Sequence, residues 1–106
     1  MEDIIMYIFE KTRNVNTREF EPCVTFFNDR TQDYISVTLP TIVQISRVMK
    51  AFVHNGRPLE YFQIFEESTR RLICFSFSYK AVSISNADND PVLIPIDEFE
   101  DAIRHC

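Results

Sequence analysis

One segment of the chain, residues 72–79, alternates between large apolar side chains and small ones. Ile73, Phe75 and Phe77 occupy every second position, with cysteine and serines between them. This alternation is typical of a strand that packs one face on a core and turns the other toward solvent. The fold is therefore expected to contain a sheet with one buried face, the usual arrangement of an antiparallel sheet.

Six further segments have strand character because they alternate or are rich in β-branched and aromatic residues. These strands are expected over residues 3–10, 19–28, 34–39, 59–67, 82–85 and 92–96. Polar clusters predict turns or loops at residues 11–18, 28–33, 68–71 and 86–91. The chain is therefore expected to consist largely of short strands with polar connections.

Two segments have apolar residues at helical spacing. Residues 40–54 place Ile42, Ile45 and Met49 on one face, and Gly56 follows where a helix commonly ends. Residues 97–103 repeat the pattern over a shorter length. Each segment begins with the pattern of a capping box, in which two side chains bond to backbone N–H groups of the first turn. The boxes pair Thr41 with Gln44 and Asp97 with Glu100.

These elements predict a single α+β domain over residues 1–106, in which an antiparallel sheet of six or seven strands carries two helices on one face. A chain of this length buries about 65% of the surface that it exposes when unfolded, and hydrophobic residues make up 45% of it. The expected core consists of Ile5, Ile8, Val24, Phe26, Ile35, Val37, Ile45, Met49, Phe52, Phe62, Ile64, Ile73, Phe75, Phe77, Ile84, Phe99 and Ile103.

Some landmarks recur at a spacing of 56 residues. The sequence Ile-Phe-Glu occurs at residues 8–10 and again at 64–66, and the two capping boxes have the same separation. The apolar positions of the two helices do not align at this spacing. Two interpretations remain open: an internal duplication of residues 1–55 and 57–106, or two similar units of β-hairpins and a helix.

An order of three or four antiparallel strands followed by a helix, present twice, resembles the repeats of the PUR and PC4-like proteins that bind single-stranded nucleic acid. The resemblance covers the order of the elements and no signature residues. It implies binding of single strands on the exposed face of the sheet. Such binding uses Lys and Arg beside aromatic side chains. The best candidates are Arg57, Arg70, Arg71 and Lys80 with Tyr61, Phe77 and Tyr79.

The charge of the chain favours a different partner. Sixteen acids and eleven bases give a net charge of −5, whereas nucleic-acid binders are normally basic. Residues 88–101 contain six acids and no base, namely Asp88, Asp90, Asp97, Glu98, Glu100 and Asp101. These acids are either a solvated surface that favours solubility or a docking surface for a basic partner.

The docking interpretation predicts a non-enzymatic protein-binding module that acts on a protein with a basic surface or one that handles nucleic acid. Inhibitors, immunity proteins and phage anti-defence proteins are of this kind, an analogy at the level of the class. The alternative is a PUR- or PC4-like binder of single strands. Exposed strand edges and ten phenylalanines favour a homodimer.

No motif for catalysis, phosphate binding or a cofactor is recognisable, so neither an enzymatic activity nor a cofactor is expected. Asn86, Asp88 and Asp90 have the spacing of the first ligands in a calcium loop. That loop needs Gly where Pro91 stands and a bidentate Glu where Asp97 stands, so a polar turn is expected instead of a metal site.

The three cysteines, Cys23, Cys74 and Cys106, are odd in number and lack metal-binding or redox spacing. They are expected to be reduced thiols, which predicts a cytoplasmic location. The first residues contain acids where a secretory signal has lysines, and no apolar run is long enough to cross a membrane. Neither export by such a signal nor a membrane partner is therefore expected.

Overall fold

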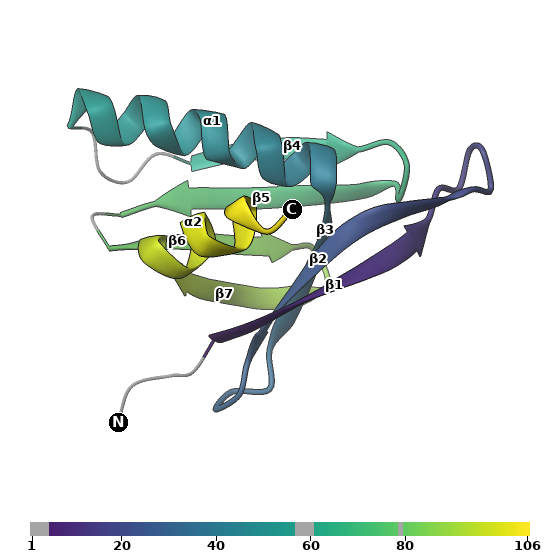
Figure 1. The fold of residues 1–106 in the computed structure, drawn as a ribbon, viewed down its shortest axis with the longest axis horizontal. Helices are drawn as coiled ribbons and strands as arrows, with labels where there is room; N and C mark the ends of the chain where they lie inside the picture. The colour runs from purple at the N-terminus through teal and green to yellow at the C-terminus, as the bar shows by residue number, and fades with distance from the viewer. Residues whose placement is uncertain (1–4, 57–60, 79) are drawn as a thin grey trace.

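The computed structural model describes residues 5–56, 61–78 and 80–106. Three strands and a helix are followed by four strands and a second helix (Figure 1). The elements are β1 (Ile5–Arg13), β2 (Phe20–Asn28), β3 (Tyr34–Thr38), α1 (Leu39–Asn55), β4 (Tyr61–Glu66), β5 (Arg71–Phe77), β6 (Ala81–Asn86), β7 (Asn89–Pro95) and α2 (Ile96–Arg104). The α+β class is confirmed. Neither described helix combines the length and the apolar character needed to cross a membrane.

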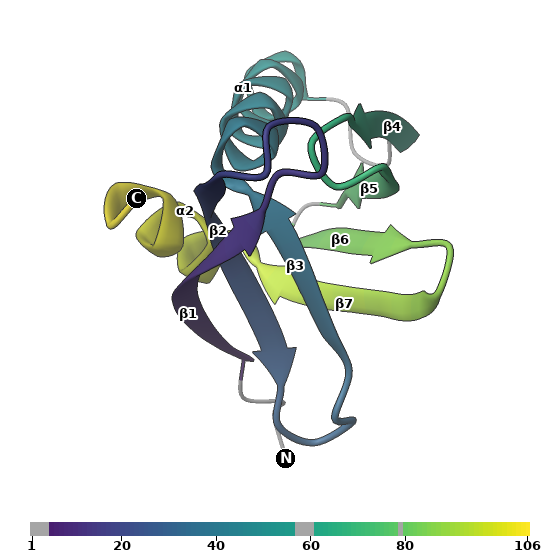
Figure 2. The ribbon, with the colours of Figure 1, turned by 90° about the vertical axis from the view of Figure 1, so that its right-hand side faces the viewer.

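The strands of the described residues form two antiparallel sheets rather than one. The first has the order β1-β2-β3 and the second the order β4-β5-β6-β7. Figure 2 shows that the strands of the two sheets run in different directions. The expectation of a single sheet is wrong, because alternation identifies strands but not their partners, and α1 intervenes between β3 and β4 so that β4 begins a new sheet.

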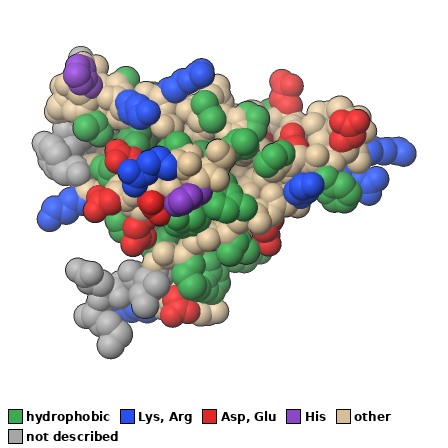
Figure 3. All heavy atoms as spheres, in the orientation of Figure 1, with side chains coloured by type: hydrophobic (Ala, Val, Ile, Leu, Met, Phe, Trp, Pro, Cys, Tyr) green, Lys and Arg blue, Asp and Glu red, His purple; other side chains and the backbone are tan. Residues whose placement is uncertain are grey.

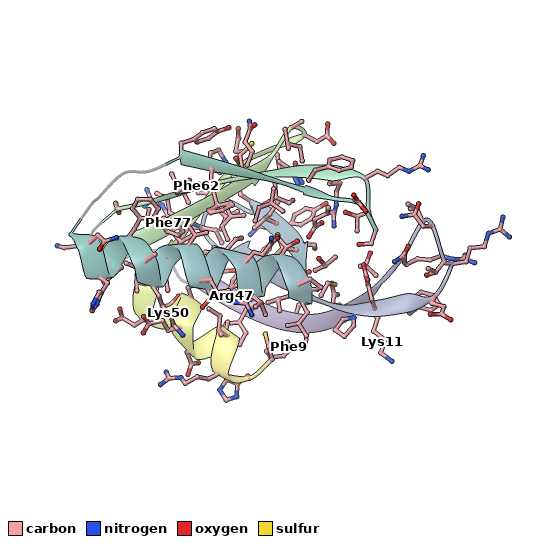
Figure 4. The ribbon with its side chains drawn as sticks, turned by 90° about the horizontal axis from the view of Figure 1, so that it is seen from above. Phe9, Lys11, Arg47, Lys50, Phe62 and Phe77 are labelled. Atoms are coloured by element: carbon pink, nitrogen blue, oxygen red, sulfur yellow. The ribbon has the colours of Figure 1, made fainter. Side chains whose placement is uncertain are left out.

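The core lies where the inner faces of both sheets meet the two helices. Both helices lie on the same side of the β4–β7 sheet, as expected (Figure 1). Figure 4 shows Phe62 and Phe77 between this sheet and α1, where the rings of Phe52 and Phe62 have centroids 5.1 Å apart. Phe26 of β2 stacks on Phe99 of α2 at 5.9 Å. Aromatic contacts thus join each helix to a different sheet.

Most of the expected core residues are buried, with one clear error. Ile8 is 52% exposed, because β1 is an edge strand and alternation turns Ile8 toward its outer face. Val82, Val92 and Ile94 are also fully buried, outside the expected set. They lie on β6 and β7, whose short segments give too few alternating positions to identify the buried face.

Neither helix begins with the capping box expected from the sequence. Helix α1 follows Thr38, so Thr41 lies in the first turn, where it is buried. A carboxylate from β4 takes over part of the capping: Glu66 accepts a hydrogen bond from the backbone N–H of Thr38 at 2.8 Å, a bond that a capping box supplies from within the helix. Helix α2 follows Pro95, and no side chain of the described residues caps it.

Three hairpin turns contain a residue other than glycine in the left-handed conformation. These residues are Arg18 and Gln32, each with φ 64°, and Arg70 with φ 56°. The conformation costs about 1–2 kcal/mol for an L residue with a Cβ atom. The single glycine, Gly56, ends α1 with φ 65°, as expected.

The hairpin between β6 and β7 is tighter than the loop expected at residues 86–91. The side-chain oxygen of Asn86 accepts hydrogen bonds from the backbone N–H groups of Asp88 and Asn89, both at 3.0 Å. Because these bonds close the turn within four residues, β7 begins at Asn89. Strand β1 likewise extends beyond its expected end, to Arg13.

Candidate functional site

The acidic segment is divided between two places in the fold. Asp88 lies in the β6–β7 turn and Asp90 near the start of β7, whereas the other four acids lie on α2, beyond the opposite end of that strand. A strand of seven residues spans roughly 20 Å. The structure therefore does not bring the six acids together, and α2 carries the larger group: Asp97, Glu98, Glu100 and Asp101.

Asp101 is engaged within the chain. The hydroxyl of Tyr7, on β1, donates a hydrogen bond of 2.5 Å to its carboxylate. This hydrogen bond lowers the pKa of Asp101, and the positive charges of His105 and Arg104 lower it further. Arg104 lies 3.3 Å and His105 3.7 Å from the same carboxylate. Asp101 therefore holds α2 against β1.

The remaining acids of α2 lack such partners. Asp97 and Glu100 are exposed and Glu98 is half-buried, and none of the three forms an ion pair with another described residue. One carboxylate oxygen of Glu98 is buried without a hydrogen-bond partner in the described part of the chain. Burial raises the pKa of Glu98, and the neighbouring charge of Asp97 raises it further.

Positive charge is also present near α2. Figure 3 shows acidic and basic side chains interspersed over this side of the molecule. A recess of about 250 Å³ separates α2 from α1, and Lys50, Glu100 and Arg104 line it. The acidic surface of α2 is therefore narrow, and Asp97 and Glu98 in the first turn form its centre. Acids at this place also stabilise the helix through its dipole.

The residues proposed for single-strand binding do not form one cluster in the described chain. Arg70 lies in the β4–β5 turn, whereas Lys80 lies beyond the opposite end of β5. Arg71 contacts the buried carboxylate of Glu66 at 3.7 Å, and Tyr61 is 61% exposed at the start of β4. Phe77 is buried. Arg57 and Tyr79 lie outside the described residues.

A polar junction joins the two sheets near Arg71. Glu66 is only 4% exposed and accepts hydrogen bonds from the hydroxyls of Thr38 at 2.9 Å and Thr69 at 2.8 Å, besides the Thr38 N–H. An open recess of about 350 Å³ lies beside it, lined in part by Cys23. Burial raises the pKa of the Cys23 thiol, which disfavours the reactive thiolate form. This junction is structural, because its carboxylate is fully engaged.

The calcium-like spacing does not correspond to a site. Asn86 uses its side-chain oxygen to close the β6–β7 turn, and Asp97 lies at the other end of β7. In the part of the chain that the structure describes, no three His, Cys, Asp or Glu side chains are grouped closely enough to hold a metal ion.

A different surface, the outer face of the β4–β7 sheet, is exposed, and the described residues that define it are uncharged. We define it by the residues that alternate with the buried positions of the sheet: Tyr61, Gln63, Phe65, Leu72, Cys74, Ser76, Ala81, Ser83, Ser85, Pro91, Leu93 and Pro95. Tyr61, Phe65 and Leu93 are 57–61% exposed. The alternation that predicts β5 also predicts its outward positions, but only the register of four strands shows that these form one face.

Comparison with known proteins gives no match: no family model matches the sequence, and neither a curated protein nor a solved structure is significantly similar to the chain.

Proposed function

We propose that the chain is a non-enzymatic protein-binding module that uses the acids of α2 to dock on a basic surface of another protein. The observation that carries the proposal is the set of three acids on one short helix, Asp97, Glu98 and Glu100, that have no ion-pair partner among the described residues. Proteins that handle nucleic acid have basic surfaces, and an inhibitor of such a protein would present acids in this way.

Glu98 gives the proposal its physical basis. Its half-buried carboxylate has one oxygen without a hydrogen-bond partner among the described residues, and a buried acceptor without a partner is unfavourable. A Lys or Arg side chain of the partner beside this carboxylate would favour its charged form. The net charge of −5 would also accelerate association with a basic protein, most strongly at low ionic strength.

Affinity capture from a lysate of the source cell, followed by measurement of the purified partner's affinity, tests this function. The variant combines Asp97→Asn, Glu98→Gln and Glu100→Gln, and we expect its affinity to fall at least about tenfold with a weaker dependence on salt. The control combines Asp88→Asn with Asp90→Asn, which lie at the other end of β7, and should retain the affinity. Equal affinity and salt dependence in all three proteins would contradict the proposal.

Binding of single-stranded nucleic acid is the second candidate, favoured by the exposed aromatic rings of Tyr61 and Phe65 on a sheet face. No Lys or Arg lies among the residues of that face, and backbone phosphates require such cations. We therefore expect no change in fluorescence polarisation of a labelled oligonucleotide at low salt. Binding that weakens with salt would favour this second function over the first.

A further inference from the structure

We propose that the outer face of the β4–β7 sheet binds a second copy of the chain, sheet against sheet. The large side chains of this face remain exposed after folding: Tyr61 61%, Leu93 60%, Phe65 57% and Leu72 40%. Both helices lie on the opposite side of the sheet, and Figure 4 shows only side chains beyond the face. Large apolar side chains that stay exposed on one uncharged face favour an interaction there.

The charge distribution of the chain favours a second copy as the partner that binds this face. Each copy carries a net charge of −5, so two copies repel one another wherever acidic surfaces meet. None of the residues of the outer face is charged, and the acids of α2 lie on the other side of the sheet. A second copy can therefore approach through this face with the least repulsion, whereas a strongly charged partner would find no complementary charge on it.

The shape of the face suits a second sheet. One row across the four strands runs Tyr61, Ser76, Ser83, Leu93, so its large side chains lie at the two edges and its small ones in the middle. Sheets pack about 10 Å apart with interdigitating side chains. The edge side chains of one copy can thus fill the shallow middle of the other about a two-fold axis.

Polar groups on the face are partly satisfied before any contact. The side-chain amide of Gln63 donates a hydrogen bond of 3.1 Å to the hydroxyl of Tyr61 and lies 3.8 Å from the sulfur of Cys74. Burial of an amide costs least when its hydrogen bonds already exist. The serine hydroxyls can turn toward the other copy, since both faces present donors and acceptors.

The size of the face sets the strength of the association. Four strands about 4.8 Å apart and six residues long cover about 20 Å by 20 Å. The flat area of this face, counted for both copies, is on the order of 800 Å². Stable complexes bury about 1,200–2,000 Å². An area below this range is typical of weak, transient association, so the dimer is expected to be reversible.

Sedimentation velocity over a wide range of concentrations tests the proposal. We expect a monomer–dimer equilibrium in the unmodified chain and a dissociation constant raised at least about tenfold by Leu93→Glu. The matched control is Val53→Glu, which makes the same charge change at a side chain that is 62% exposed on α1, on the helix side. The proposal is overturned if the chain stays monomeric at every concentration. It is also overturned if Val53→Glu raises the dissociation constant as much as Leu93→Glu does.

Salt separates this contact from the one proposed for α2. Salt screens the repulsion between two acidic copies, so dimerisation should be equal or stronger at high salt, whereas docking of α2 on a basic protein should weaken. Dimerisation that weakens with salt contradicts the sheet contact and leaves the proposed function standing.

A second readout does not depend on a substitution in the face. Cys74 lies in the centre of the face and is half-buried. In a Cys106→Ser background, we expect its reaction with a small thiol reagent to slow as the protein concentration rises through the dimer equilibrium. A rate independent of concentration overturns the proposal, even where Leu93→Glu fails to fold.

Discussion

The outer faces of the two sheets differ in how their side chains are satisfied. On the β1–β3 sheet, the hydroxyl of Thr25 donates to Glu10 at 2.9 Å and is hydrogen-bonded to Ser36 at 2.7 Å. On the β4–β7 sheet, none of the described residues that define the outer face is charged, and Tyr61 and Leu93 stay exposed. The first face combines these charged and polar contacts with exposed apolar side chains such as Ile8, which is 52% exposed, whereas the second offers apolar area with no charged group beside it among the residues that define the face.

The course of the chain explains this difference. The tip of the β1–β2 hairpin contacts the β4–β5 turn, where the N–H of Val15 donates to the carbonyl of Ser68 at 2.7 Å. Thr69 and Arg71 from that hairpin line the recess on the first sheet. No described element reaches the outer face of β4–β7 in this way. The β4–β5 turn therefore covers part of the outer side of the first sheet, whereas the described elements leave the outer face of the second sheet open.

The largest expected effect contrasts the two sides of β5. Phe75 is 2% exposed on the inner side, so Phe75→Ala should lower the free energy of unfolding by about 3–5 kcal/mol through lost burial and a cavity. Cys74→Ala, one position along and on the outer side, should cost less than about 1 kcal/mol in the monomer. Chemical denaturation measures both. A cost below about 1 kcal/mol for Phe75→Ala would place it outside the core.

The next largest effect is expected from a substitution that removes the polar junction between the two sheets. Glu66→Ala leaves the N–H and hydroxyl of Thr38 without their acceptor, and we expect a loss of about 2–3 kcal/mol in the free energy of unfolding. Glu67→Ala, at the exposed neighbouring position, serves as the control and should change stability by less than about 0.5 kcal/mol. Similar values for the two variants would show that the junction does not stabilise the contact between the sheets.

A pH-dependent effect tests the attachment of α2. Because the hydrogen bond from Tyr7 lowers the pKa of Asp101 in the folded chain, its contribution is present above the unfolded pKa, near 3.9, and is lost as the pH falls through the folded pKa. The same bond raises the pKa of Tyr7, so stability should also fall above about pH 10. Tyr7→Phe should reduce both dependences in urea denaturation series. Unchanged pH profiles would contradict this assignment.

The smallest effect is expected in the turn between β4 and β5, which contacts the β1–β2 hairpin of the first sheet. Arg70 closes the β4–β5 turn with φ 56°, a conformation that glycine adopts without strain. Arg70→Gly should therefore raise the free energy of unfolding by up to about 1 kcal/mol. Arg70→Ala removes the same side chain but keeps the strain, and should give no gain. Thermal unfolding of the two variants side by side makes the comparison.

Local pattern in the sequence predicts much of this fold. The alternation of Ile73, Phe75 and Phe77 identifies both the strand and its buried side, and Gly56 identifies the end of α1. The start predicted for α1 is wrong because its cap includes Glu66, which is 28 residues away from Thr38. The spacing of residues within the helix cannot identify a capping partner that lies on another element. The division into two sheets is missed for the same reason, since it depends on contacts between distant strands.

The sequence predicts which acids belong to the candidate site but not where they lie in the fold. Six acids without a base are visible in residues 88–101, but β7 separates Asp90 from Asp97, and Asp101 bonds to Tyr7, which is 94 residues earlier. Proximity in sequence therefore overstates the acidic surface. The uncharged face is the opposite case, because its members come from four strands and form a surface only in the folded chain. The possible duplication of the two halves stays a prediction.

The carboxylate of Glu66 also bears on the order of events in folding. It lies on β4, yet it completes the start of α1, which precedes β4 in the chain. Helix α1 therefore gains its full stability only after the β4–β5 hairpin has formed. A fragment that ends at Gly56 would lack this contact and the inner face of the second sheet, so the two halves are expected to unfold in one cooperative transition.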